Sequence, residues 1–252
     1  MYIHPIIINT IMSLTSFIKN LVPPGFKNKL RHKLGVPSQE SSFINLKNLG
    51  YTPGVVLDIG AYEGLWTKAF KQQFPEAHIL MIEGQTAKAD KLLQVTRELS
   101  HTAFKIELLG SEKSEVEFNV YDTASSVLKE DNETPAIVEK RVLNLLDDVV
   151  KGTEFETPDF IKIDTQGYEL EILKGGPNTL KAARFVLLEV SLLNIYKNCP
   201  LVDEVMAFMK LQGFVLYDIC SLLRRPYDNA LNQCDFLFIK ENDALRASTR
   251  WS

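Results

Sequence analysis

The stretch Asp58-Ile-Gly-Ala-Tyr-Glu-Gly64 constrains the fold more than any other part of the chain. It follows the apolar run Val55-Val56-Leu57 and precedes an amphipathic stretch that begins at Leu65. A buried strand, a glycine turn and a helix in this order are typical of a nucleotide-cofactor cradle, because glycines let the backbone approach a ligand and the first helical turn offers free N–H groups. Glycines after a strand are also ordinary turn residues, so the motif needs support from elsewhere in the chain.

A second apolar strand supplies this support. It runs from His78 to Glu83 and ends in a carboxylate at about the spacing from Asp58 that a βαβ unit gives to the acid that binds ribose hydroxyls. The turn lacks the third glycine of a pyrophosphate fingerprint, and the carboxylate of Glu63 would face the phosphates of NAD. S-adenosylmethionine has a sulfonium, an amino acid end and a ribose but no phosphate, so this acidic loop favours it.

Length and composition allow one substantial core. The 252 residues are 45% hydrophobic and carry a net charge of −4, which argues against a nucleic-acid partner. The three cysteines lack C-x-x-C spacing and are interpreted as reduced thiols of a cytoplasmic protein. The four histidines form no ligand pair at helical spacing, so we expect no built-in metal.

The beginning of the chain differs from the rest, and we expect a leader segment at 1–42 ahead of one domain at 43–252. Residues 1–35 contain five basic residues and no acidic one. The apolar stretch from Ile3 to Ile18 is too short and too interrupted for a membrane span, and its charges come in the wrong order for a signal peptide. A loosely packed leading helix and a peripheral membrane contact through residues 1–34 both stay open, as does the choice of Met1 or Met12 as the start.

Strand and helix patterns alternate after a linker-like segment at 35–53, which predicts an α/β fold with a mostly parallel sheet and helices on both faces. The predicted strands are 55–59, 79–83, 103–109, 159–164, 184–190, 214–219 and 235–240. The predicted helices are about 64–73, 85–99, 167–182 and 201–212. The last two strands, separated by a loop of about 15 residues, are expected to form a terminal antiparallel hairpin.

Residues 111–158 depart from this alternation and are interpreted as an insertion that flanks the site. The segment from Glu115 to Tyr121 alternates with period two, which predicts an exposed antiparallel strand. A polar loop with Ser125 and Ser126 follows, and then a charged segment, Lys129–Glu139.

Two acids stand where buried strands end. Asp164 follows Phe160-Ile-Lys-Ile163, and Glu189 follows the apolar run at 185–188. Open α/β sheets bind ligands outside the carboxyl ends of their strands, so either acid is a candidate general base for a hydroxyl acceptor. The two acids could instead hold a divalent cation, which we rank below direct base action. A structural alternative for Glu189 is a buried ion pair with Lys162 or Arg184.

Together these motifs resemble the FkbM-type methyltransferases, an S-adenosylmethionine-dependent family with a Rossmann-like class I core. The resemblance covers about residues 43–240. It rests on the Asp58–Gly64 loop, on Phe160-Ile-Lys-Ile-Asp-Thr-Gln-Gly-Tyr-Glu169 with Leu173-Lys-Gly175, on Leu188-Glu189 and on Gln233-Cys-Asp-Phe-Leu-Phe238. One departure is Gly84, because the family commonly has proline after the second-strand acid.

The resemblance implies a role for each matching position. Those assigned to the methionine end of the cofactor are Asp58, Gly60, Ala61 and Gly64. Glu83 would bind the ribose, Leu109 and Gly110 would lie near the adenine, and Asp164 would border cofactor and acceptor.

The resemblance also implies methylation of a hydroxyl group on a carbohydrate or related natural-product or glycan acceptor. The alternatives are an NAD-dependent oxidoreductase and a catalytically silent binding module that retains the cofactor fold. The acceptor's identity and the oligomeric state stay open.

Overall fold

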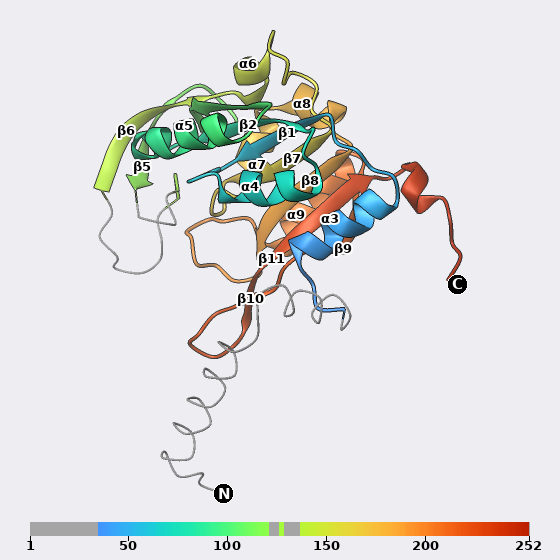
Figure 1. Ribbon diagram of the computed structural model, residues 1–252. Helices are drawn as coiled ribbons and strands as arrows, with labels where there is room; N and C mark the ends of the chain where they lie inside the picture. Colours follow the sequence, from blue (N-terminus) through green and yellow to red (C-terminus); the bar gives the residue numbers. More distant parts are fainter. Residues whose placement is uncertain (1–34, 121–125, 129–136, 252) are drawn as a thin grey trace, which may run out of the picture. The chain divides into compact units, whose positions relative to one another are not determined.

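The structure is a computed structural model that describes residues 35–120, 126–128 and 137–251 (Figure 1). The chain divides into two compact units, Met1–Ser38 and Gln39–Ser252, and the second is described below. The leading helix and the membrane contact predicted for 1–34 lie outside the described residues. In the described part of the chain, no helix is long and apolar enough to cross a membrane.

The second unit is built on an eight-stranded sheet with the order β10-β11-β8-β7-β1-β2-β3, and β9 pairs with β11 (Figure 1). Its parallel strands are β1 (Val55–Ile59), β2 (His78–Glu83), β3 (Thr102–Ile106), β7 (Phe160–Ile163) and β8 (Phe185–Ser191). Its antiparallel strands are β9 (Phe214–Ile219), β10 (Leu223–Arg224) and β11 (Leu231–Lys240). The predicted parallel sheet and terminal hairpin are confirmed, and the carboxyl ends of the parallel strands share one edge.

Helices cover both faces of this sheet, as predicted. One face carries α3 (Gln39–Asn48), α4 (Leu65–Gln73) and α5 (Ala89–Glu98), with the short helix η1 (Thr86–Lys88) before α5. The other carries α6 (Leu146–Val150), α7 (Glu169–Lys174), α8 (Pro177–Ala182) and α9 (Val202–Leu211). Successive strand residues point to opposite faces: Val56 packs on the α3 and α4 side, and Leu57 packs on the side of α6 to α9. A final short helix, η2, spans Ala244–Arg246.

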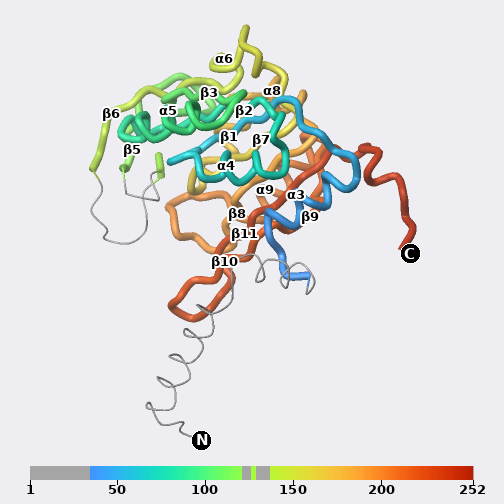
Figure 2. The backbone as a smooth tube through the Cα atoms, in the orientation of Figure 1, coloured from blue at the N-terminus to red at the C-terminus, as the bar shows by residue number. Residues whose placement is uncertain are grey.

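Helix α3 corrects the linker interpretation of residues 35–53. Its Phe43 lies 4.9 Å from the Phe70 ring and 6.1 Å from the Phe160 ring, and its Leu46 is fully buried. Figure 2 traces α3 beside α4. Because these aromatic contacts come from distant parts of the chain, tertiary packing stabilises a helix that the local pattern does not reveal. The helix also crosses the predicted boundary at residue 42.

The insertion contributes two strands to a three-stranded sheet with the order β4-β6-β5, and β4 precedes the insertion. The strands of this sheet are β4 (Leu108–Leu109), β5 (Glu115–Val120) and β6 (Ile137–Asn144). The antiparallel strand predicted at 115–121 is β5, which pairs with β6. Strand β6 itself was not predicted, and most of the predicted charged segment at 129–139 lies outside the described residues.

Two predicted elements are interrupted in the structure. The strand expected at 103–109 breaks at Glu107, whose carboxylate accepts a hydrogen bond from Asn144 Nδ2 at 2.8 Å. The helix expected at 167–182 breaks at Gly175-Gly176-Pro177 into α7 and α8. A Cβ on Gly175 would lie 2.0 Å from the carbonyl oxygen of Gly110, so only glycine allows this close approach.

Candidate active site

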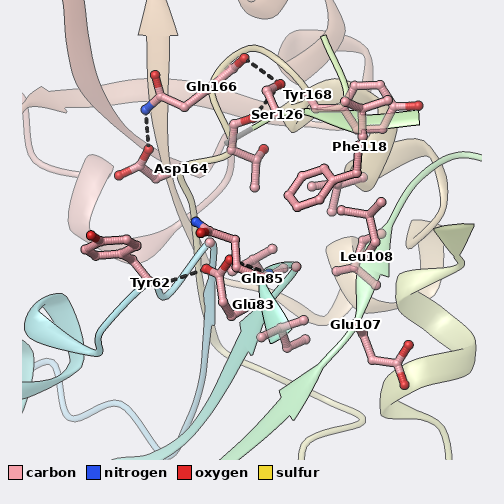
Figure 3. A pocket seen from close by; sticks show the side chains of 18 residues that line it. Tyr62, Glu83, Gln85, Glu107, Leu108, Phe118, Ser126, Asp164, Gln166 and Tyr168 are labelled. Carbon is pink, nitrogen blue, oxygen red and sulfur yellow. Dashed lines mark hydrogen bonds between the residues drawn. The ribbon is translucent and has the colours of Figure 1, made fainter. Parts of the chain in front are cut away.

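A cavity of about 230 Å³ opens at the carboxyl edge of β1, β2, β3 and β7 (Figure 3). Four predicted site residues line it: Gly60, Glu83, Leu109 and Asp164. The other predicted site residues lie outside its lining: Asp58, Ala61, Gly64, Gly110 and Glu189. Their proposed cofactor and catalytic roles stay predictions.

Gly60 is required by a backbone contact. Its φ is 72°, and a Cβ at this position would lie 1.9 Å from the carbonyl oxygen of Asp164. The N–H groups of Gly60 and Ala61 donate to the carbonyl of Ile82 at 2.9 and 3.1 Å, so they point into the protein. The loop after β1 therefore lies directly against Asp164, the residue that follows β7.

Asp58 is fully buried on the α4 face of the sheet. It accepts a hydrogen bond from Thr67 Oγ1 at 2.7 Å and lies 3.1 Å from Lys162 Nζ, which also donates to the carbonyl of Gly60 at 3.0 Å. Burial disfavours the charge on Lys162, but the carboxylates of Asp58 and Asp164 outweigh it and raise the lysine pKa. The Asp58–Lys162 ion pair and the Thr67 hydrogen bond connect β1, β7 and α4. The close ion-pair partner of Lys162 is therefore Asp58, whereas the sequence alternative considered Glu189 for this role.

Glu83 ends β2 and is almost completely buried. Its Oε2 accepts a hydrogen bond from the N–H of Tyr62 at 2.7 Å, and its Oε1 accepts one from the N–H of Gln85 at 2.8 Å (Figure 3). Burial raises the pKa of this carboxyl, and the two backbone hydrogen bonds oppose the change. Since each carboxylate oxygen has two acceptor positions, Glu83 can still accept hydrogen bonds from ligand hydroxyls in the cavity.

Strand β4 and the insertion together supply an apolar wall that the sequence analysis missed. Leu108 and Phe118 line the cavity (Figure 3) and pack together with Leu143. A Cβ on Gly84 would lie 2.9 Å from Leu108 and 3.2 Å from Phe118, so the departure from proline at Gly84 accommodates this wall. The available signal was Phe118, an aromatic residue in the middle of the alternating strand.

Asp164 lies at the cavity with 39% of its side chain exposed. Its Oδ1 accepts a hydrogen bond from Gln166 Nε2 at 3.1 Å, and its Oδ2 is 3.8 Å from Lys162 Nζ. The same Gln166 nitrogen donates to Glu189 Oε2 at 2.8 Å. The structure therefore brings the two predicted carboxyls together through a glutamine that the sequence analysis did not select.

Glu189 differs from Asp164 in its surroundings. Gln233 Nε2 donates a second hydrogen bond to its Oε2 at 3.0 Å. Burial raises the pKa of Glu189 strongly, and the charges of Asp164, Glu169 and Asp235 add to this effect. The raised pKa favours the protonated form of Glu189, and the more exposed Asp164 is the better placed proton acceptor.

Glu169 stabilises the turn between these acids and α7. Its Oε1 accepts hydrogen bonds from the N–H groups of Thr165 and Gly167 at 2.9 and 3.1 Å and from Thr165 Oγ1 at 3.2 Å. Burial raises the pKa of this carboxyl to about 7. Glu169, the first residue of α7, thus also closes the turn that presents Gln166.

The structure also describes the surroundings of the loop acid Glu63 and the acids near the cavity. Glu63 Oε1 lies 3.2 Å from Lys88 Nζ, so the loop acid has a cationic partner, and the acids that line the cavity are Glu83, Glu107 and Asp164. Within the described ranges, no group of three or more His, Cys, Asp or Glu residues is arranged to hold a metal ion.

Comparisons with known proteins identify the family. Residues 58–216 match the model of the methyltransferase FkbM domain. Over 44 residues the chain is 41% identical to the hexuronic acid methyltransferase AglP of Haloferax volcanii, and the match covers 18% of each protein.

Solved structures of methyltransferases are also similar. The precorrin-6y C5,15-methyltransferase of Geobacter metallireducens has 11% identity and a TM-score of 0.46, over 80% of this chain and 88% of that one. The magnesium protoporphyrin IX methyltransferase of Synechocystis, with bound S-adenosylmethionine, has 12% identity and a TM-score of 0.46, over 80% of this chain and 77% of that one.

The family match includes the loop after β1, Glu83 and the whole Lys162 to Glu169 block. It decides against the NAD-dependent oxidoreductase alternative. Because the match covers more than half of the chain, the protein belongs to the FkbM methyltransferase family and is an S-adenosylmethionine-dependent methyltransferase.

Proposed function

We propose that the enzyme methylates a hydroxyl oxygen of a carbohydrate or a related natural-product or glycan acceptor. The observation that carries this proposal is Asp164, a partly exposed carboxylate at the same cavity as Glu83. A hydroxyl acceptor must lose a proton when it is methylated, and a carboxylate at this position can take it. The 44-residue similarity to a hexuronic acid methyltransferase supports a sugar acceptor.

The cavity residues fit S-adenosylmethionine. Glu83 offers carboxylate oxygens to the ribose hydroxyls, and Leu108 and Phe118 offer apolar surface to the adenine ring. When bound, the cofactor supplies a methyl group that is already activated by its sulfonium. The protein then has to align the acceptor and exclude water, which accounts for much of the acceleration in reactions of this kind.

We assign proton removal to Asp164. Its carboxylate lines the cavity, whereas burial raises the pKa of Glu189 and favours its protonated form. General-base catalysis contributes about 10²–10⁴-fold to a rate. The alternative, a divalent cation that activates the hydroxyl, predicts that chelators lower the rate of the parent enzyme.

We assign the reaction to the cytoplasm. The thiols of Cys199, Cys220 and Cys234 are free and buried, as is common in reducing compartments. A peripheral membrane contact through residues 1–34 is part of this proposal. It predicts that an enzyme without residues 1–34 is recovered with membranes to a smaller extent than the full chain.

The decisive experiment is methyl transfer with an isotopically labelled donor. The purified enzyme is incubated with labelled S-adenosylmethionine and an extract of its host, and the labelled product is identified. We expect a methyl ether, with Asp164→Asn as the control that forms little product. Label on nitrogen or carbon would contradict the proposal, and S-adenosylhomocysteine binding without transfer to any fraction would favour the silent binding module.

A further inference from the structure

We propose that Gln166 is a positioning residue that holds Asp164 and Glu189 as one carboxyl pair, with Asp164 turned to the cavity. The inference rests on the proposed function, because it assigns the supporting contacts of the base. It concerns a side chain whose amide nitrogen donates to both acids.

The hydrogen bonds define the pair. One amide nitrogen, Gln166 Nε2, donates to Asp164 Oδ1 at 3.1 Å (Figure 3). The same nitrogen donates to Glu189 Oε2 at 2.8 Å. An amide nitrogen has two hydrogens, so each acid receives one. Tyr196 donates its hydroxyl hydrogen to Gln166 Oε1 at 2.7 Å, which keeps the nitrogen directed at the acids.

The backbone holds Gln166 in a conformation that side chains rarely adopt. Its φ is 57°, and the next residue, Gly167, has a φ of 95°. Ser126 Oγ donates to the Gln166 carbonyl at 3.2 Å, and Glu169 closes the turn from the other side. Non-glycine residues with positive φ concentrate at functional sites, where surrounding contacts maintain them.

Other charges surround the pair on every neighbouring strand. Lys162 on β7 lies near Asp164 and is itself paired with Asp58 on β1. The charges of Glu169 on α7 and Asp235 on β11 both raise the pKa of the Glu189 carboxyl. Lys162 is thus a single cation beside several acids. The amide of Gln166 is a neutral donor that stabilises Asp164 and Glu189 next to each other.

The pair has a defined task in the reaction. The acceptor O–H bond breaks and its proton goes to Asp164, while the oxygen bonds to the methyl carbon and the electron pair of the broken S–C bond stays on sulfur. Gln166 donates to the carboxylate form of Asp164 and thus favours the state that accepts the proton. No further reagent is needed.

The first test compares Gln166→Leu with the parent in a pH–rate profile. We expect kcat to fall roughly tenfold to a hundredfold and the acid limb to move up by about one pH unit, the effect of one hydrogen bond to a charged group. The dissociation constant of S-adenosylhomocysteine should stay within about twofold, since Gln166 has no assigned cofactor contact. A fall in kcat with an unmoved acid limb would reduce Gln166 to a structural role.

The matched control is Gln233→Leu, which removes the other amide donor of Glu189 and leaves Asp164 with Gln166. Its acid limb should move less than that of Gln166→Leu. If Gln166→Leu does not fold, Tyr196→Phe provides the second variant, because loss of its hydroxyl frees the Gln166 amide. It should move the acid limb in the same direction by a smaller amount, and an unmoved limb would overturn the proposal.

The second test needs no acceptor. Carbon-13 NMR of protein labelled at its glutamate carboxyls follows the Glu189 signal with pH, and Glu189→Gln assigns it. We expect its titration midpoint to change by about one pH unit or more in Gln166→Leu. An unchanged midpoint refutes the pair, whereas a changed midpoint in an enzyme that methylates no hydroxyl retains the pair and refutes the proposed function.

Discussion

Replacing Glu83 by glutamine tests the cofactor side of the cavity, because both carboxylate oxygens already accept backbone hydrogen bonds. Oε2 accepts from Tyr62 and Oε1 from Gln85, at 2.7 and 2.8 Å. A glutamine side chain has only one acceptor oxygen, so its NH₂ group would face one of these N–H groups. The substitution keeps the shape of the side chain and removes one of its two acceptors.

The expected size of the effect follows from these contacts. A buried donor left without a partner costs about 1–3 kcal/mol, and we expect the free energy of unfolding to fall by this amount. Losing hydrogen bonds between ribose hydroxyls and a charged group costs about 1.5–3 kcal/mol, or roughly tenfold to 150-fold in affinity for S-adenosylhomocysteine. Burying the Glu83 charge opposes folding, and glutamine carries no charge. We therefore expect the loss in the free energy of unfolding to lie toward the lower end of the range for an unpaired buried donor.

Glu169→Gln is the matched control. Its three donors converge on Oε1 alone, so an amide oxygen can replace that atom. Calorimetric titration with S-adenosylhomocysteine and chemical denaturation should show weak binding and lower stability for Glu83→Gln, and neither defect for Glu169→Gln at pH 8. Parent-like binding by Glu83→Gln would show that this carboxylate does not hold the ribose.

The remaining predictions concern the base, the buried acid, the glycine turn and the leader. Asp164→Asn should lower kcat by about 10²–10⁴-fold with little change in S-adenosylhomocysteine affinity, and equal turnover would remove Asp164 as the base. The Glu169 pKa of about 7 lies above its ordinary value of 4.5, so its stabilising contribution is present below pH 4.5 and is lost as pH rises through 7. Denaturation across this range should show a loss of about 3 kcal/mol in the parent that is missing in Glu169→Gln. Gly60→Ala should destabilise the protein by more than about 2 kcal/mol, whereas Gly50→Ala, which has a positive φ of 84° but open space, should cost only about 1 kcal/mol; similar melting temperatures for both would refute the close-contact argument. Deleting residues 1–34 should leave S-adenosylhomocysteine binding intact, because the compact unit begins at Gln39, and loss of binding in calorimetry would contradict this.

Elements with a strong local pattern could be predicted from the sequence. The bounds of β1 and β9 agree with the predicted strands, because continuous apolar runs between turn residues specify them locally. Helix α3 depends instead on contacts of Phe43 with Phe70 and Phe160, which no local window contains. Strand β6 exposes Ile137, Val138 and Val142 and buries only Leu143 among its apolar residues, so its apolar pattern does not mark a buried face.

The site shows the same division between local and distant information. The acids at strand ends could be selected because a parallel sheet brings its carboxyl ends together. Asp58 could not be distinguished from a lining residue, since only the fold shows that its side chain points to α4 and meets Thr67. Gln166 and Phe118 owe their positions to partners more than twenty residues away, Glu189 for the first and Leu143 for the second.

The contact between Gly60 and the Asp164 carbonyl has a consequence for redesign of this enzyme. Since backbone meets backbone there, the spacing between the cofactor loop and the carboxylate cannot be adjusted by changing side chains. Attempts to alter acceptor choice should leave these two loops untouched and diversify the insertion, which reaches the cavity through Phe118, Ser126 and Val127. The enzyme thus separates a rigid part that sets the geometry of transfer from an exchangeable part that shapes the pocket.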